Sequence, residues 1–431
     1  MFAPEHRDGS GPVSIIRKRK ANEFTTESVP YVSIPHKLTG EMSEARDYQL
    51  STRLTELSLL YKAVQSLDAG EIPRGTIFGP EGEEVDGGES QLSMFKGKLD
   101  VKTPGKVIWA GHSFGAATMV QFIKSIYYMG TEEWKAQVPL FNLQEHEAAE
   151  LRGQITKKSP LLLLDLWSLS LLGSKRTYWL WKKPLPQVIP LDENEKDGED
   201  ACRLLTIMSQ QFYVWKENMW AVKWVLSRNP GLRDGAVREI FDYDPITGKK
   251  IHTPPPSTNT SGSATPASEE VVTGEKSDGY RPPKLYYIKQ SAHLSQSDFN
   301  LLFPIMFRKE VLDPKRVLGL NVRAAVQWLR EAGFRKELAP HEQVGGQSDD
   351  GEIFGCAEVE EGLSVEEKGE NEGKKQVLEG WVRLGLHEEK IKKKAVKEAV
   401  REGMGAGGEA DLEAEGDLEE GRERRGRRNK I

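Results

Sequence analysis

The sequence Gly-His-Ser-Phe-Gly at positions 111–115 has the residue types and spacing of a nucleophile elbow. Glycines two positions before and two after the serine suit a strained turn, where larger side chains would collide with a strand and a helix. The apolar run Lys106–Ala110 precedes this motif, and the amphipathic stretch Ala116–Tyr128 follows it. The pattern predicts that Ser113 attacks an acyl group and that the Phe114 N–H donates to the oxyanion. The alternative is an ordinary strand-to-helix turn with an exposed serine.

A serine hydroxyl is a weak nucleophile until a base removes its proton, and that base is usually histidine. The chain has 8 histidines. In folds with such an elbow, the histidine comes last, after the serine and the acid. His293 alone directly follows a late apolar strand, in LYYIKQSAHLSQSDF. It is therefore the predicted base, and a loop histidine packed on Phe299 is the alternative.

The acid that orients the imidazole is expected to leave a strand between the serine and the histidine. Asp165 follows four leucines in LLLLDLWSLSLL, and a carboxylate buried there needs a partner such as an imidazole. The next strand ends in Ser-Gln-Gln at 209–211, without a carboxylate. Asp165 is therefore the predicted acid, with a helix N-cap as its alternative role. Such a triad uses no metal or organic cofactor, and none is expected.

Strand-like and helix-like segments alternate along the chain, and this order would position the three side chains. Apolar runs predict strands over 106–110, 160–165, 203–208 and 284–290. Helical spacing predicts helices over 43–67, 116–128, 211–227 and 321–333. The alternation predicts an α/β fold with a mostly parallel sheet and helices on both faces.

The composition of the 431-residue chain changes at about residue 340. Residues 1–340 hold nearly all the periodic apolar structure and form the predicted α/β domain. A stretch rich in Pro, Ser and Thr at 253–283 interrupts this domain and is expected to be disordered. Residues 341–431 are rich in Glu, Gly and Lys. We expect a mostly disordered tail there, with a solvated charged helix over 376–401.

Charge and cysteine content exclude some classes of function. The net charge of -6 argues against a nucleic-acid-binding protein. The basic end EGRERRGRRNK fits a nucleic-acid or acidic-lipid contact, but a solvated tail is the favoured interpretation. The two cysteines, Cys202 and Cys356, favour a reducing compartment. The sequence shows neither a signal peptide nor a membrane span, so we expect a cytoplasmic protein, with a peripheral membrane contact as an alternative.

Aromatic and basic residues occur together at 178–183, in Tyr-Trp-Leu-Trp-Lys-Lys. This mixture suits contact with a phospholipid surface, where rings and cations both find partners. Ordinary packing of the rings in the core and at its rim is the favoured alternative, because aromatic side chains also dominate cores.

Five segments of the chain resemble the platelet-activating factor acetylhydrolases of the monomeric plasma and intracellular type. They are EHRDGS, GHSFGAAT, LLDLWSLSL, MSQQFYVWKENMWAVKWVL and SAHLSQSDF. The resemblance covers about residues 3 to 335, apart from insertions. It implies an α/β-hydrolase fold with Ser113 as the nucleophile, Asp165 as the orienting acid and His293 as the base. It also implies a phospholipid substrate. The expected reaction is calcium-independent hydrolysis of a short sn-2 acyl ester, as in 1-alkyl-2-acetylglycerophosphocholine.

The chain departs from that family chiefly at its start. In the family's fold, several strands precede the nucleophile strand, and an early loop, usually containing His-Gly, donates a second oxyanion N–H. This chain begins at MFAPEHRDGS, after the expected position of that loop. We therefore expect an N-terminally truncated α/β-hydrolase domain with Phe114 as its remaining donor, poorly folded and nearly inactive alone. The alternatives are an impaired remnant or binding protein of the same fold, or an esterase or thioesterase of other small acyl substrates.

Overall fold

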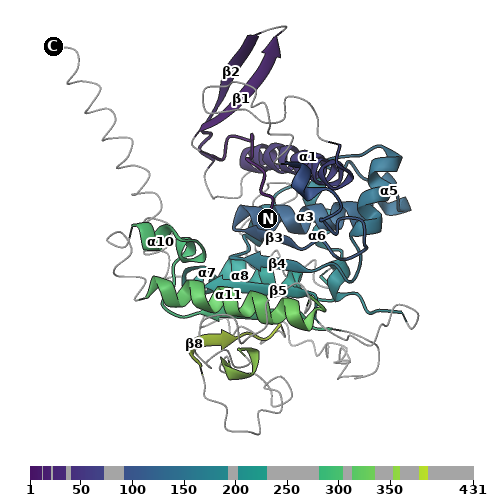
Figure 1. Cartoon of the computed structure of the whole chain (residues 1–431). Helices are drawn as coiled ribbons and strands as arrows, with labels where there is room; N and C mark the ends of the chain where they lie inside the picture. Colours follow the sequence, from purple (N-terminus) through teal and green to yellow (C-terminus); the bar gives the residue numbers. More distant parts are fainter. Residues whose placement is uncertain are drawn as a thin grey trace, which may run out of the picture. The chain divides into compact units, whose positions relative to one another are not determined.

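The computed structural model of the chain describes residues 1–11, 13–20, 23–34, 40–71, 92–192, 202–230, 281–303, 313–334, 353–359 and 378–386 (Figure 1). These residues belong to two compact units. Unit 1 comprises Met1–Thr206, Trp224–Lys284 and Ala325–Asp349, and unit 2 comprises Ile207–Lys223, Leu285–Ala324 and Asp350–Ile431. The predicted insertion at 253–283 lies almost entirely outside the described residues.

The first elements of unit 1 are two antiparallel strands, β1 (Val13–Lys20) and β2 (Glu23–Pro30). Their register runs from Val13 opposite Pro30 to Lys20 opposite Glu23. The sequence patterns predict no element here, because basic residues fill the second half of β1. Pairing with β2 forms this strand in spite of its weak apolar pattern.

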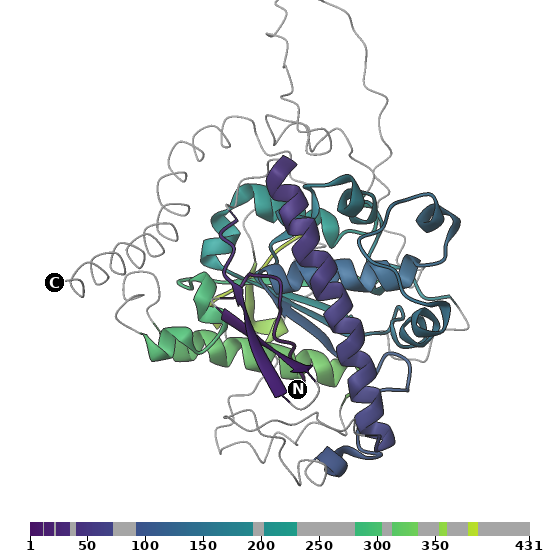
Figure 2. The same ribbon diagram turned by 90° about the horizontal axis from the view of Figure 1, so that it is seen from above.

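Two long helices contribute to the core of unit 1. The first, α1 (Gly40–Ala69), buries the stripe that helical spacing predicts, namely Leu50, Leu54, Leu57, Tyr61 and Val64. The second, α3 (Phe114–Tyr128), is buried along most of its length, because it packs against both α1 and the strands beside it. Figure 2 shows α1 crossing over this part of unit 1.

The predicted strands around the elbow are present with slightly shifted ends. β3 (Trp109–His112) and β4 (Leu161–Leu164) pair in parallel, with His112 opposite Leu164. β5 (Leu204–Ser209), which begins in unit 1, is the other neighbour of β4. Leu161 and Leu163 of β4 are buried and Leu162 and Leu164 are half-buried, so both faces of this strand are at least partly covered, which explains its continuous apolar pattern.

Shorter helices complete unit 1. They are α4 (Glu132–Lys135), α5 (Glu145–Gln154), α6 (Lys175–Trp181) and the 3-10 helices η1 (Ser93–Phe95), η2 (Ser168–Leu171) and η3 (Pro186–Val188). On α6, Tyr178 and Trp181 are buried and stack with ring centroids 5.8 Å apart. The ammonium of Lys182 lies 4.7 Å from the Tyr178 centroid. This packing agrees with the interpretation that these rings belong to the core and its rim.

Unit 2 contains β6 (Lys284–Ile288) from Leu285 on, α7 (Gln210–Val214), α10 (Phe299–Leu302), β7 (Ala357–Val359), β8 (Leu378–Arg383) and the 3-10 helices η5 (His293–Gln296) and η7 (Phe354–Cys356). α8 (Lys216–Val225) and α11 (Pro314–Glu331) have residues in both units. The single helix predicted over 211–227 is in fact α7 and α8, because the backbone leaves the helical region at Trp215 (φ -76°, ψ 87°). α11 begins earlier than predicted. Asp313 accepts a hydrogen bond from the Arg316 N–H, and Pro314 suits a first helical position.

The segment 376–401, predicted as a charged helix, instead contains strand β8 at its start. β8 pairs antiparallel with β6 and parallel with β7. Trp381 and Val382 are buried in this strand, and burial of two β-favouring side chains outweighs the helical preference of the charged residues around them. Residues 387–401 lie outside the described residues.

The strands and helices make the chain an α/β protein, as predicted. Apart from the β1–β2 pair, β3 with β4 and β7 with β8 are parallel, whereas β6 with β8 is antiparallel, so these strands are mixed but mostly parallel. None of the helices in the described part of the chain has the length and apolar character needed to cross a membrane.

Candidate active site

Ser113 occupies the turn between β3 and α3 in a strained conformation, with φ 57° and ψ -122°. A non-glycine residue held there costs on the order of 1–3 kcal/mol, so its surroundings must fix it. They do so through the backbone. The Ser113 N–H donates to the Leu164 carbonyl (2.9 Å), and its carbonyl accepts from Ala116 (3.0 Å) and Ala117 (3.2 Å). The strand, turn and helix that a nucleophile elbow requires are therefore all present.

The two glycines of the motif differ in their steric role. A Cβ atom on Gly111 would lie 2.4 Å from the carbonyl oxygen of Gly115, closer than such atoms approach in proteins. Outside its chain neighbours and the backbone of its own helix, a Cβ atom on Gly115 would meet no heavy atom of the described residues within 4 Å. The collision predicted for both positions therefore exists at Gly111 and not at Gly115. Gly111 allows α3 to start close against β3.

Asp165 lies beside the elbow at the same edge of the sheet. It follows β4 directly, just as Ser113 follows β3, and the residues before them, His112 and Leu164, are opposite each other in the parallel register. Asp165 is fully buried and also has a positive φ, 44°. It is not a helix N-cap, because η2 begins later, with Trp167 as its N-cap. A buried carboxylate at the carboxyl end of a strand suits a catalytic or binding role.

A histidine next to the serine also approaches this carboxylate. A ring nitrogen of His112 and a carboxylate oxygen of Asp165 lie within 4.8 Å of each other. His112 is the last residue of β3 and directly precedes Ser113, so this pair lies at the elbow.

His293 belongs to unit 2, where it starts η5 after β6. Its backbone N–H donates to Oε1 of Gln211 (2.8 Å). Its ring stacks on Phe212, with centroids 4.3 Å apart and planes 17° apart. The structure thus brings Ser113, Phe114 and Asp165 together in unit 1 and fixes the backbone and ring of His293 within unit 2.

Asp192, an alternative acid in a polar loop of the sequence, and the described histidines His6 and His146 lie in other surroundings. Asp192 is exposed and forms an ion pair with Lys157 (3.3 Å). His6 bonds to Glu56 (2.8 Å) in unit 1. His146 is exposed on α5. The histidines at 36, 252, 341 and 387 lie outside the described residues.

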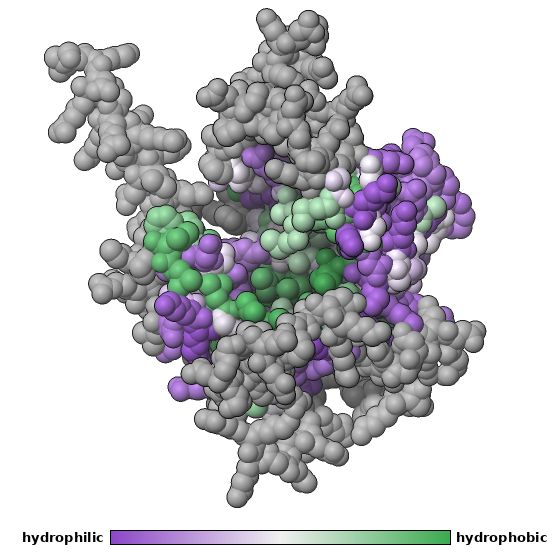
Figure 3. Space-filling view, viewed as in Figure 1, coloured by the Kyte–Doolittle hydropathy of each residue, from purple (hydrophilic) through white to green (hydrophobic). Residues whose placement is uncertain are grey.

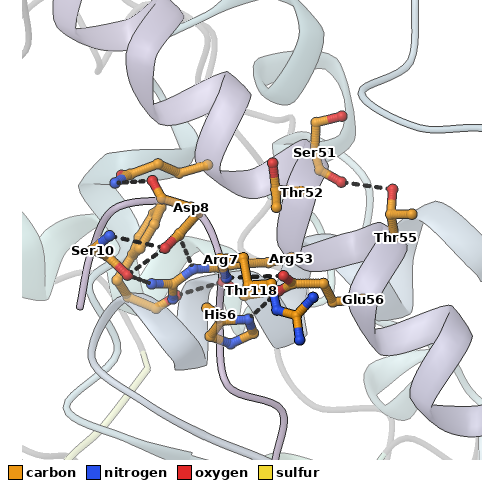
Figure 4. A network of polar contacts seen from close by, with 12 residues as sticks. His6, Arg7, Asp8, Ser10, Ser51, Thr52, Arg53, Thr55, Glu56 and Thr118 are labelled. Carbon is orange, nitrogen blue, oxygen red and sulfur yellow. Dashed lines mark hydrogen bonds and ion pairs between the residues drawn. The ribbon is translucent and has the colours of Figure 1, made fainter. Parts of the chain in front are cut away.

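A buried ion pair near the elbow was not predicted from the sequence. Asp8 accepts from Nε of Arg53 on α1 (2.5 Å), and the two side chains are 0% and 7% exposed. Ser10 donates to the same carboxylate through its hydroxyl (2.6 Å) and its N–H (3.0 Å). Figure 4 shows Arg53 on α1 beside Asp8 and Ser10. Although burial acts to raise the pKa of Asp8, Arg53 and the Ser10 hydrogen bonds hold it below its usual value. The sequence offers one hint of this pair, because Arg53 lies directly before Leu54 of the apolar helical stripe.

Two guanidinium groups from α1 lie over Phe114 of the elbow and the neighbouring Trp167, which we call the elbow rings. Arg53 is 4.5 Å from the ring centroid of Phe114. Arg46 is 5.1 Å from the same ring and 4.8 Å from that of Trp167. The rings of Phe114 and Trp167 lie 5.6 Å apart. The residue whose N–H is the candidate oxyanion donor is therefore held by two cations and a second ring.

The sequence comparison with protein families finds one relevant match. The family model described as platelet-activating factor acetylhydrolase, isoform II, matches residues 1–138. A search among curated proteins finds no match. The matched segment contains the buried ion pair, α1 and the elbow, whereas Asp165 and His293 lie beyond it.

This match agrees with the architecture of the chain. The family is an α/β-hydrolase family, and the mostly parallel strands with their helices have that character. Its name also supports ester hydrolysis of the acetylhydrolase type in general. The match over the elbow and the helix above it supports the assignment of this chain to the platelet-activating factor acetylhydrolase family.

Proposed function

We propose that the chain hydrolyses the sn-2 acetyl or short acyl ester of phospholipids such as 1-alkyl-2-acetylglycerophosphocholine, without calcium and through an acyl-enzyme. The observation that carries this proposal is the strained elbow at Ser113 beside the buried Asp165. Strained residues and a buried carboxylate at the ends of neighbouring parallel strands are typical of catalytic sites. The family match over the elbow supports the same chemistry.

The reaction would proceed in two steps. The Ser113 hydroxyl attacks the ester carbonyl carbon while His293 accepts its proton. The Phe114 N–H donates to the oxyanion, and Asp165 orients the imidazole and stabilises its charge. His293 then gives the proton to the departing lysophospholipid alcohol. In the second step His293 activates water, which attacks the acyl-serine ester and releases the short-chain acid and free Ser113.

Apolar surface near the predicted base supports a lipid substrate. Leu301, Leu302 and Phe303 in and after α10 are 39%, 64% and 47% exposed. They follow His293 closely in unit 2, and Figure 3 shows the apolar surface over α10. Exposed apolar side chains gathered in this way suit contact with lipid.

A fluorophosphonate probe tests the nucleophile, because it reacts covalently with activated serines. We expect labelling of Ser113, found by peptide mass spectrometry, and hydrolysis of 1-alkyl-2-acetylglycerophosphocholine in the presence of a calcium chelator. Ser113→Ala should abolish both. Ser58→Ala, which removes an exposed hydroxyl that donates to the Thr55 carbonyl within α1, should change neither.

Three other outcomes would change the assignment. Labelling that survives Ser113→Ala would move the nucleophile elsewhere. Labelling with turnover of p-nitrophenyl acetate or an acyl thioester, but not of the phospholipid, would identify an esterase or thioesterase of other acyl groups. Absence of both labelling and turnover in the folded chain would favour an impaired or binding protein.

A further inference from the structure

Arg46 on α1 is a half-buried cation whose bonds within the described part of the chain go to neutral groups. It donates to Oε1 of Gln49 (2.8 Å) and to the carbonyl oxygen of Ile34 (2.8 Å). Its Nε is buried and has no acceptor among the described residues. A guanidinium group carries five N–H donors, so this side chain retains unused hydrogen-bonding capacity.

Among the residues that the structure describes, the charges around Arg46 do not balance. The nearby carboxylate, Asp8, is committed to Arg53 and Ser10. Two guanidinium groups therefore share one carboxylate. Burial and the charge of Arg53 lower the pKa of Arg46 to about 10, so Arg46 is still protonated at neutral pH. A desolvated charge without a counter-charge is costly, and a bound anion would offset that cost.

Arg46 is also placed at the elbow. Its guanidinium group lies over the rings of Phe114 and Trp167. Phe114 follows Ser113 directly, and the Trp167 N–H lies 3.4 Å from the Ser113 carbonyl oxygen, to which it donates. In a phospholipid, the phosphodiester sits on the glycerol carbon next to the sn-2 ester. An ester at Ser113 would therefore carry its phosphate into the neighbourhood of this cation.

We propose that Arg46 binds the phosphodiester of the substrate while Ser113 attacks the sn-2 ester. This inference rests on the proposed function and names the group that selects a phospholipid over a neutral ester. The planar guanidinium fork matches two oxygens of a phosphate, as a lysine ammonium does not. Arg53, in contrast, is a positioning residue, because its Nε is held by Asp8 and its charge is compensated there.

The test compares three esters with the same acyl group in wild type and Arg46→Gln. They are 1-alkyl-2-acetylglycerophosphocholine, 1-alkyl-2-acetylglycerol, which lacks the phosphate, and p-nitrophenyl acetate. Loss of a charge-assisted bidentate contact should lower kcat/KM for the phospholipid by about 10- to 100-fold. The two neutral esters should be unaffected. Arg46→Lys should fall between wild type and Arg46→Gln, because it keeps the charge and loses the fork.

Arg176→Gln is the matched control. Arg176 is also half-buried in unit 1, donates to the Pro139 carbonyl (2.8 Å) and has a buried Nε without an acceptor in the described part of the chain. It lies on α6, and among the described residues the cations found over the elbow rings of Phe114 and Trp167 are Arg46 and Arg53, so the loss of Arg176 should leave all three activities unchanged. An equal loss on all three esters in Arg46→Gln, or no loss on the phospholipid, would overturn the proposal.

A binding measurement separates this proposal from the proposed function, because it needs no turnover. By calorimetry, glycerophosphocholine should bind wild type and not Arg46→Gln. This binding result supports the phosphate site even if the chain hydrolyses neither acetyl lipid. Lack of hydrolysis would contradict only the proposed function. Equal binding to the two proteins would overturn the site. Tighter binding of inorganic phosphate than of glycerophosphocholine would identify free phosphate, not the lipid headgroup, as the ligand and would also overturn it.

Discussion

Ser113 and Asp165 hold unfavourable backbone conformations at equivalent ends of β3 and β4, with φ 57° and 44°. Each backbone would adopt a negative φ if its neighbours allowed it, since positive φ is uncommon for residues other than glycine. Hydrogen bonds from Ser113 to β4 and α3 prevent this at the serine. The steric contribution comes from Gly111, whose missing side chain leaves room for the carbonyl of Gly115.

Substituting each glycine of the elbow should give opposite results. Gly111→Ala places a Cβ atom 2.4 Å from a backbone oxygen, so β3 and α3 must separate and Ser113 must move. We expect esterase activity to fall at least about 100-fold, since a small misplacement of a reacting group costs this much. Outside its chain neighbours and the backbone of its own helix, Gly115→Ala meets no described atom within 4 Å and adds helix propensity, so activity should persist. Kinetics on p-nitrophenyl acetate and thermal unfolding of both variants check this, and equal losses would contradict it.

At the scale of elements, α3 connects the elbow to the core and carries an unusual buried charge. Lys124 is 1% exposed and donates to the Trp181 carbonyl (3.2 Å) on α6. Burial lowers the pKa of Lys124 from 10.5 to about 7. The helix that positions Ser113 is therefore less stable than its apolar packing alone would make it.

Replacing this lysine should change how stability depends on pH. Between about pH 7 and 10.5 the unfolded chain holds a proton on Lys124 that the folded chain lacks, so the unfolding free energy rises with pH. Below about pH 7 both states hold it, and the stability from this group is lowest. Lys124→Met should raise Tm at pH 7 by several degrees and flatten this rise, as measured from pH 6 to 9. Lys135→Met, at a lysine 60% exposed on α4, should do neither.

At the scale of the whole molecule, a strand from the charge-rich end of the chain is built into unit 2. β8 pairs with β6 and β7, and its Trp381 is 0% exposed. The Trp381 ring stacks on Tyr286 with centroids 4.7 Å apart and planes 5° apart. Residues beyond 340 thus contribute to a core and not only to a tail.

Truncating this tryptophan should destabilise unit 2. Trp381→Ala removes a fully buried ring, and such a change costs about 3–5 kcal/mol. Leu302→Ala, at a side chain 64% exposed on α10, should cost less than about 0.5 kcal/mol. Urea unfolding followed by tryptophan fluorescence and far-ultraviolet circular dichroism measures both. An unchanged midpoint for Trp381→Ala would mean that β8 adds little to the stability of this unit.

The sequence alone determined the features that depend on neighbouring residues. The elbow at 111–115, the leucine strand before Asp165 and the apolar stripe of α1 each have a local pattern, because turn sterics and periodic burial act over a few residues. The α/β class follows from the alternation of such segments. The role of His293 as the base stays a prediction, although its position after β6 agrees with the sequence.

The tertiary structure alone decided the contacts between distant parts of the chain. Asp8 and Arg53 pair across 45 positions, and Arg46 contacts Phe114 and Trp167; the sequence patterns predicted neither arrangement. β8 is a strand because β6 offers it hydrogen-bonding partners and buries Trp381, although its charged surroundings predict a helix. Burial and pairing with a remote neighbour outweigh local propensity by several kcal/mol, so only the folded chain reveals them.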